Sequence, residues 1–91
     1  MNYYITKYCL LDGIKEINSE DKKISFIEVR EDKHGDPYLF VRYKDSSFDL
    51  YFDKQWFTSK KKAIEEAERQ RIEKIKELEK QIKILKKMDF N

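Results

Sequence analysis

The spacing of hydrophobic residues changes at about residue 58, from alternation in short runs to steps of three and four. Residues 58–88 contain no Gly or Pro and are dense in Glu, Lys, Ile, Leu and Ala, which favour helices. This pattern predicts one helix of about thirty residues, roughly 45 Å long, with Thr58 or Ser59 as its N-cap. The stripe on one face of this helix consists of Ile64, Ala67, Arg71, Ile75, Leu78, Ile82 and Leu85.

Before residue 58, runs rich in aromatic and β-branched residues are separated by polar turns, which is typical of antiparallel strands. We expect strands within 3–11, 14–17, 23–31, 38–44 and 48–53. No helix is predicted between them, so the sequence indicates an α+β fold. Its parts would be an antiparallel β-meander of four to five strands in residues 1–57 and one long C-terminal α-helix in residues 58–88. We expect the whole chain, 1–91, to form a single domain.

The two glycines of the chain mark two of these turns. Asp12-Gly13 separates the first two runs and predicts a two-residue hairpin that would place Tyr8 opposite Ile17, because a type I′ turn needs positive φ angles. Gly35 lies in a polar loop before the fourth run, where we expect it to adopt the left-handed conformation.

The alternation leaves open which face of the sheet the helix covers, because both faces carry apolar side chains. In the last strand, Asp49 and Asp53 share one face, and we expect them on the solvent side. The first half of the helix is expected to pack on the sheet through Ile64, Ala67 and Ile72.

The chain is highly charged but nearly balanced. Charged residues make up 42% and aromatic residues 14%, so we expect a small core built from aromatic side chains. Residues 1–57 hold 9 basic and 11 acidic side chains, net −2, and residues 58–91 hold 11 and 7, net +4. This charge is weaker than the basic footprint of a dedicated DNA-binding domain. We recognise neither a membrane span nor a signal peptide and therefore predict a cytoplasmic protein that does not bind membranes.

The sequence offers no constellation typical of catalysis, and we expect no catalytic residues, no cofactor and no metal. One cysteine, Cys9, and one histidine, His34, cannot form an internal disulfide or a zinc site. Cys9 lies in a predicted strand, where a buried thiol is its ordinary role, and His34 lies in a turn. Asp49 and Asp53 would be about 13 Å apart along a strand, too far for a glycosidase pair.

Two basic features are candidates for contact with an anion or with nucleic acid. They are Tyr38, Phe40 and Arg42 on one face of a predicted strand, and Lys60, Lys61 and Lys62 at the start of the helix. Aromatic residues interleaved with arginine on a sheet are typical of single-stranded nucleic-acid binding. Backbone N–H groups and ammonium groups at a helix start suit a phosphate-like anion. Each feature also has a structural interpretation, as the covered face of the sheet and as a solvated charge run.

The distal half of the helix carries a seam of the coiled-coil type. Its residues are Ile75, Leu78, Ile82 and Leu85. Upstream the seam would place Glu68 and Arg71 at core positions, so it extends over about two heptads. A stripe of four large aliphatic residues needs a partner, and we expect a homodimer or a contact with another protein. The alternative, a helix that lies wholly across its own sheet, stays open.

The two ends of the chain share a combination of residues with a known group of proteins. The opening strand has Tyr4, Thr6, Lys7, Tyr8, Gly13 and Ile14, and the closing segment has Trp56, Thr58, Glu66, Ala67, Lys74, Ile75, Leu78, Lys80, Gln81, Ile82, Leu85 and Phe90. Together they resemble small proteins encoded by phages and prophage-like elements. Lys61 and Lys62 depart from that pattern, which has acidic residues there. The resemblance implies a mobile-element origin and a role as an inhibitor of host defences or a regulator, and it assigns no functional residues.

We therefore predict a non-catalytic binding protein, encoded by a phage or mobile element, that inhibits a host defence protein in the host cytoplasm through protein–protein contact. The alternative is a nucleic-acid-binding accessory or regulatory protein that uses the aromatic and basic sheet face and the lysine-rich helix start. The two differ in salt dependence, because binding to phosphates weakens steeply as salt rises.

Overall fold

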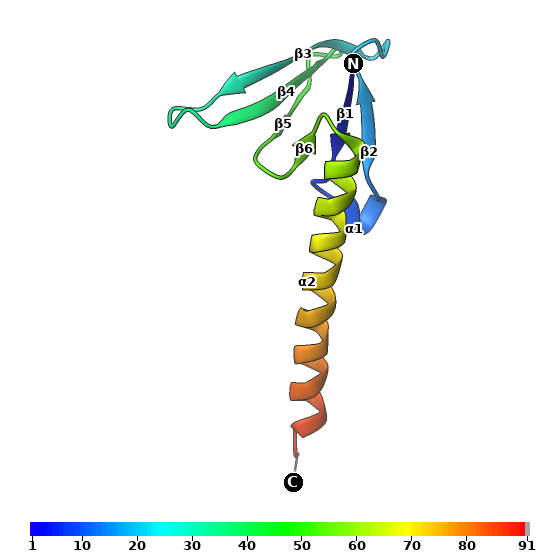
Figure 1. Cartoon of the computed structure of the whole chain (residues 1–91), viewed down its shortest axis with the longest axis vertical. Helices are drawn as coiled ribbons and strands as arrows, with labels where there is room; N and C mark the ends of the chain where they lie inside the picture. The colour runs from blue at the N-terminus through cyan, green and yellow to red at the C-terminus, as the bar shows by residue number, and fades with distance from the viewer. Residues whose placement is uncertain (91) are drawn as a thin grey trace.

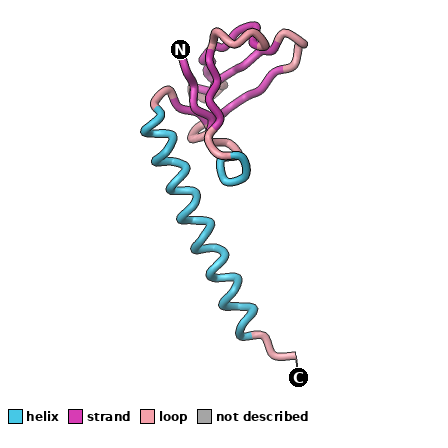
Figure 2. Tube along the Cα trace, turned by 90° about the vertical axis from the view of Figure 1, so that its right-hand side faces the viewer, coloured by secondary structure: helices cyan, strands magenta, loops and turns pink. Residues whose placement is uncertain are grey.

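The computed structural model describes residues 1–90, and a long helix projects from a β-sheet region in it (Figures 1 and 2). The elements are β1 (Asn2–Ile5), α1 (Cys9–Asp12), β2 (Lys15–Asn18), β3 (Ile24–Glu31), β4 (Pro37–Tyr43), β5 (Phe48–Tyr51), β6 (Trp56–Phe57) and α2 (Lys60–Lys87). We call residues 1–57 the head. The molecule measures 60 × 28 × 26 Å, and α2 runs along its long axis. The predicted α+β class and the long C-terminal helix are confirmed.

The strands form two three-stranded antiparallel sheets, and not a single meander. The first sheet has the order β2-β1-β6 and the second has the order β3-β4-β5. Only the second sheet is a meander of consecutive strands. β6, which the sequence did not predict as a strand, returns to the start of the chain, where Trp56 pairs with Ile5 and Phe57 with Tyr4.

The predicted two-residue hairpin between the first two strands is wrong. β1 and β2 pair antiparallel, but Ile17 lies opposite Tyr3, and Tyr8 lies outside the sheet. The chain between the strands forms the helical turn α1, which ends at Gly13. The N–H of Gly13 donates to the Cys9 carbonyl at 2.9 Å, and its φ of 75° is the expected positive one. Gly13 therefore ends a helix instead of forming a hairpin turn.

Thr6 explains why the first strand stops early. Its backbone N–H donates to the Gln55 carbonyl at 2.9 Å, and its Oγ1 donates to the Lys54 carbonyl at 2.5 Å. Thr6 is fully buried with these bonds. They tie the end of β1 to the turn before β6, almost fifty residues away, so the chain diverts there.

One core fills the space between the facing sides of the two sheets. Its buried members are Tyr3, Ile5 and Ile17 from the first sheet and Ile24, Leu39, Val41 and Tyr51 from the second. Leu39 and Val41, on the central strand β4, have no exposed surface. A register shift between Ile24 and Phe26 marks a bulge, and Ile24 is buried while Phe26 is exposed.

The prediction that Asp49 faces solvent is also wrong. Asp49 pairs with the buried Val41 and lies on the inner side of β5, where its Oδ2 accepts hydrogen bonds from the hydroxyls of Tyr43 (2.8 Å) and Tyr51 (3.3 Å). The two phenols satisfy the carboxylate, so the strand can turn this polar residue inward. Burial, followed by the hydrogen bond to Asp49, raises the pKa of Tyr43 to about 12. Asp53, in the turn after β5, is exposed.

α2 packs on the first sheet, through β1 and β6, and on α1. Its N-cap is Ser59, one of the two predicted caps, whose Oγ accepts from the Lys62 N–H at 3.3 Å. The buried residues of α2 are Ala63 and Glu66. The expected packing through Ile64 and Ile72 is wrong, because these side chains are 45% and 46% exposed. Ala63 is small and brings the helix close to the head, and this turns its larger neighbours outward.

Glu66 is a buried carboxylate at the contact between α2 and the head. Its carboxylate accepts hydrogen bonds from Nε and Nη2 of Arg69, both at 2.8 Å, and from Nε2 of Gln70 at 2.8 Å. The bonds from Arg69 hold the pKa of Glu66 below its usual value. Gln70 in turn accepts from the Cys9 thiol at 3.3 Å, which links α2 to α1.

Candidate functional site

The distal part of α2 projects away from the head and carries the predicted seam. We call Ile75, Leu78, Ile82 and Leu85 the distal seam; they are 42%, 44%, 50% and 62% exposed. All residues 71–90 are exposed. Within the described chain the helix therefore does not lie across its own sheet (Figure 1), and the four aliphatic side chains are exposed to solvent.

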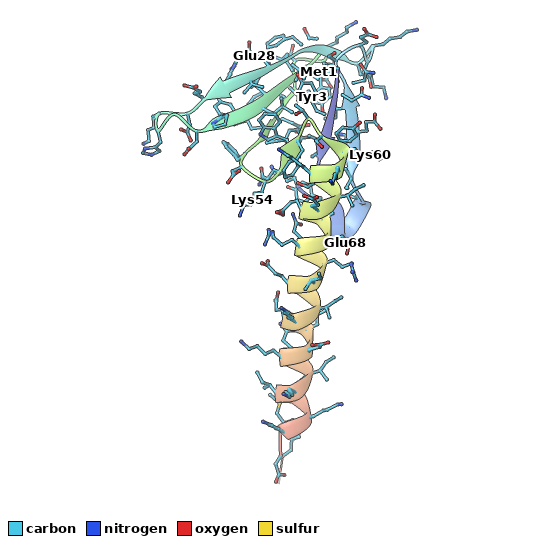
Figure 3. The ribbon with its side chains drawn as sticks, viewed as in Figure 1. Met1, Tyr3, Glu28, Lys54, Lys60 and Glu68 are labelled. Carbon is cyan, nitrogen blue, oxygen red and sulfur yellow. The ribbon has the colours of Figure 1, made fainter. Side chains whose placement is uncertain are left out.

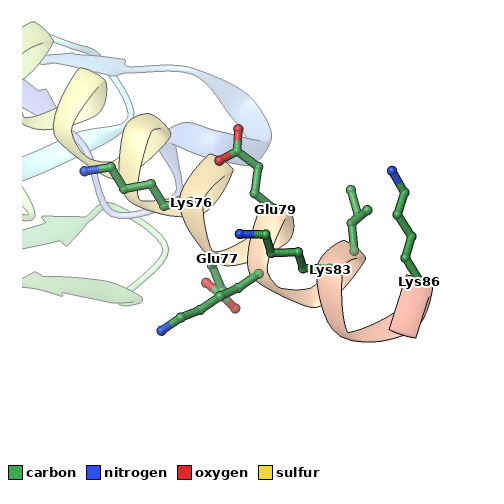
Figure 4. Close-up of a pocket in the computed structure, with 7 residues that line it drawn as sticks. Lys76, Glu77, Glu79, Lys83 and Lys86 are labelled. Atoms are coloured by element: carbon green, nitrogen blue, oxygen red, sulfur yellow. The ribbon is translucent and has the colours of Figure 1, made fainter. Parts of the chain in front are cut away.

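The hollow beside the distal seam is formed by α2 alone. It is lined by Lys76, Glu77, Glu79, Lys80, Ile82, Lys83 and Lys86. Figure 4 shows the labelled lysine and glutamate side chains reaching from one helix into open space. Such a surface cannot enclose a small molecule, and it suits a partner that lies along the helix.

The distal seam and the head contact occupy different flanks of α2. Successive residues are about 100° apart around a helix, so Ala63, Glu66 and Gln70 define the flank that faces the head. The seam is rotated by about a quarter turn from that flank. Ile64 and Arg71 precede the seam on the same face of α2. The head therefore leaves the seam side of the helix accessible along its length.

An ion pair marks the upper end of the seam. Arg71 donates from Nη2 to Oε2 of Glu68 at 2.7 Å and from Nε to the same oxygen at 3.0 Å. Both side chains are about half exposed. The apolar seam therefore begins at Ile75, after this ion pair.

The second candidate is the outer face of the β3-β4-β5 sheet, on the side opposite the core. We call this set the outer face: Phe26, Glu28, Arg30, Tyr38, Phe40, Arg42, Phe48, Leu50 and Phe52. Tyr38, Phe40 and Arg42 share this face, as the alternation predicted. Phe40 is only 7% exposed, because neighbouring side chains cover its ring.

The structure separates the lysine-rich helix start from the outer face. Lys60, Lys61 and Lys62 are exposed in the first turn of α2, which follows β6 of the other sheet. In Figure 3, Glu28 on β3 lies towards the end of the molecule that is remote from the distal helix, and Lys60 lies where α2 begins. The two features that the nucleic-acid alternative would use, the sheet face and the lysine-rich helix start, therefore belong to different parts of the fold.

The residues considered for catalysis lie apart from one another. Cys9 begins α1, and burial raises the pKa of its thiol, which disfavours the nucleophilic thiolate. His34 is exposed in the β3–β4 loop, where its N–H donates to Asp32 at 2.8 Å. In that loop Gly35 has the predicted positive φ, 81°. In residues 1–90 no group of three His, Cys, Asp or Glu residues is placed to hold a metal ion, and no helix is both long and apolar enough to cross a membrane.

The sequence interpretation missed the exposed rings of the outer face. Phe48 and Phe52 are 54% and 46% exposed, although the pattern favoured the opposite face of β5 as the solvent side. Strand register was the available signal. If Phe48 pairs with Arg42 across a tight turn, it shares the face of Phe40.

Comparisons with protein-family models, with curated proteins and with solved structures find no match for this chain.

Proposed function

We propose that this protein is a non-catalytic protein-binding protein that works as a parallel dimer, held together by the distal seam. The observation that carries the proposal is the exposure of all residues 71–90, in a helix that presents four large aliphatic side chains at steps of three and four. A soluble protein rarely leaves such a stripe without a partner.

The identity of the seam residues favours a second copy in parallel orientation. In heptad terms Ile75 and Ile82 occupy position a, and Leu78 and Leu85 occupy position d. Isoleucine at a with leucine at d favours two parallel strands over three or four. In a parallel pair each residue meets its own copy, so four apolar layers form.

Charges beside the seam agree with this arrangement. Lys74 takes position g and Glu79 takes position e of the following heptad, and these positions face each other across a parallel pair. In one chain Lys74 lies 3.6 Å from Glu77, a contact on the exposed surface. In the dimer it would exchange this partner for Glu79 of the other copy.

The expected affinity is modest. The eight seam side chains of a dimer are each about half exposed, and burying the rest contributes about 1 kcal/mol per side chain, or about 8 kcal/mol in total. The loss of translational and rotational freedom offsets several kcal/mol of this. About 4–5 kcal/mol remains, so we expect a dissociation constant of about 0.2–1 mM.

Sedimentation of the full chain from about 10 μM to 1 mM tests the dimer. We expect a concentration-dependent shift to twice the monomer mass, and Leu78→Lys should abolish it without changing the melting of the head. Ile84→Lys is the matched control, because Ile84 is 58% exposed on the side away from the seam. A wild-type chain that stays monomeric throughout, or an equal effect of Ile84→Lys, would refute the dimer.

Orientation needs a separate measurement. In a Cys9→Ala background, Phe90→Cys should form a disulfide between copies rapidly under oxidation, because parallel pairing brings the two C-terminal ends together. Slow cross-linking of a chain that sediments as a dimer would contradict the parallel arrangement.

The dimer would hold two heads at one end of a shared helix pair and so present two copies of each head surface to a target. The resemblance to phage-encoded proteins adds the target class to this proposal: a host defence protein, which the bound dimer would inhibit.

A further inference from the structure

The outer face has no role in the core or in the proposed dimer, yet it exposes large aromatic rings. Phe26, Phe48 and Phe52 are 41–54% exposed on a sheet whose other side carries the core residues Leu39 and Val41. Clusters of exposed rings promote aggregation unless a ligand covers them. The composition of this face indicates which ligand that is.

The rings form a row across the three strands of the sheet. The centroids of Phe26 and Phe40 are 5.6 Å apart with planes inclined by 27°, and those of Phe40 and Phe48 are 5.6 Å apart with planes inclined by 20°. Tyr38 and Phe52 make a second pair at 5.6 Å. Phe26 and Phe48, at the two ends of the row, each have a ring plane inclined by less than 30° to that of Phe40 between them. Planar surfaces of this kind are what unpaired bases stack on.

Two guanidinium groups lie on this row. Arg30 is centred 3.8 Å above the ring of Phe40, and Arg42 lies 5.9 Å from the rings of Phe40 and Phe48. Arg42 uses Nη1 for a hydrogen bond of 2.7 Å to the Ser46 carbonyl. A guanidinium has five N–H donors and a flat face, so it can donate to a phosphate and also stack on a base.

The outer face is positive, although the head is not. Glu28 is the one carboxylate among the outer-face residues, and it pairs with Arg30. The other ten of the eleven acidic residues of the head lie in turns and loops, in α1, on the inner side of the second sheet or in the first sheet. Two arginines against one glutamate, set among aromatic rings, complement an anionic chain with planar groups.

We propose that the outer face binds single-stranded nucleic acid, with bases stacked on Phe26, Phe48 and the Tyr38–Phe52 pair and phosphates held by Arg30 and Arg42. Double-stranded nucleic acid does not fit this surface, because its bases are already stacked inside the duplex. The proposal does not depend on the dimer.

Fluorescence anisotropy with labelled oligonucleotides of about 12 nucleotides tests this proposal, since single-strand sites commonly cover 4–16 nucleotides. We expect the full chain to bind oligo(dT) or oligo(rU) more tightly than a duplex, and to bind less tightly at ~200 mM than at ~50 mM salt. The DNA and RNA arms show which single strand is preferred. Phe48→Ala should weaken binding about 5- to 100-fold, and Arg42→Gln should weaken it and lower the slope against log salt by about one unit.

Tyr8→Ala is the matched control, because Tyr8 is a 60% exposed ring at the start of α1 and outside the outer face. It should bind like the wild type. Unchanged Trp56 fluorescence would show that the Phe48 variant is folded.

The proposal is overturned if single strands do not bind at ~50 mM salt or if a duplex binds as tightly as a single strand does. It is also overturned if Tyr8→Ala weakens binding as much as Phe48→Ala does, or if replacing Lys60, Lys61 and Lys62 by Gln abolishes binding that Phe48→Ala leaves intact. Leu78→Lys should retain binding per head, so failure of the dimer and failure of this site give different results.

Discussion

Leu39→Ala should destabilise the head severely, because Leu39 lies at the centre of the core between the two sheets. Leu39 has no exposed surface and sits on the central strand of its sheet. Truncation of a fully buried leucine to alanine costs about 3–5 kcal/mol, from lost burial and from the cavity left behind. A region of about 60 residues has a total stability of about 3–9 kcal/mol. The variant should therefore lose a third or more of the free energy of unfolding.

Urea denaturation followed by fluorescence measures this loss. Trp56 is the single tryptophan of the chain, and it packs on the core with its ring 6.4 Å from that of Tyr3. Its emission therefore reports on the head alone. Circular dichroism at 222 nm reports mainly on α2, whose distal half makes no contact with the head. We expect the two signals to separate in Leu39→Ala, with fluorescence changing at lower urea.

The matched control is Leu11→Ala, the same chemical change in α1 at a side chain that is 83% exposed. Its free energy of unfolding should stay within about 0.5 kcal/mol of the wild type. If Leu39→Ala is too unstable to measure, Leu39→Met conserves volume and should cost less than about 1.5 kcal/mol. Equal losses for Leu11→Ala and Leu39→Ala would refute the placement of Leu39 in the core.

Three further changes test the local structure. Ser59→Ala removes the N-cap of α2 and should cost about 1 kcal/mol in thermal unfolding, whereas Ser59→Asp should restore it; an unchanged melting temperature would exclude the cap. Gly13→Ala should cost about 1–3 kcal/mol, because a φ of 75° with a ψ of −175° is a conformation that only glycine adopts readily; a neutral result in urea titration would contradict the backbone at the end of α1. The folded state holds the phenol proton of Tyr43 more tightly than the unfolded state does, so its contribution to stability is complete below pH ~10 and is lost as the pH rises to about 12. Melting curves from pH 8 to 12 should show less of this loss in Tyr43→Phe than in the wild type. Identical pH profiles would show that the hydrogen bond from Tyr43 to Asp49 is not responsible for the loss of stability.

The helix and the central strands follow from local sequence. The absence of Gly and Pro after residue 58 predicts α2 within two residues at either end, because helix formation depends on near neighbours. The loop before β4 contains Gly35 at positive φ and ends at Pro37, which starts the strand. The spacing of Ile75, Leu78 and the other seam residues likewise places them on one face without any knowledge of the head.

The candidate outer face could be predicted only in part. Alternation puts Tyr38, Phe40 and Arg42 together, since successive side chains of a strand point to opposite sides. It does not say that Phe40 is covered by Arg30 while Phe48 stays exposed. That distinction depends on the register between β4 and β5 and on Tyr43 and Tyr51, whose hydroxyls donate to Asp49 and so allow it to lie on the core side.

The sequence by itself determined the elements whose residues interact within a few positions of one another: the long helix, its seam, the positive φ of both glycines and the strands β3 to β5. The tertiary structure decided which sheet each strand joins and which face is buried. The bonds from Thr6 to the turn before β6 span almost fifty residues and convert an expected hairpin into α1. Ala63 and Glu66 bring one flank of α2 against the head, and this leaves Ile64 and the whole distal helix in solvent. Such contacts join residues that are far apart in the chain, so a pattern of neighbouring residues contains no record of them.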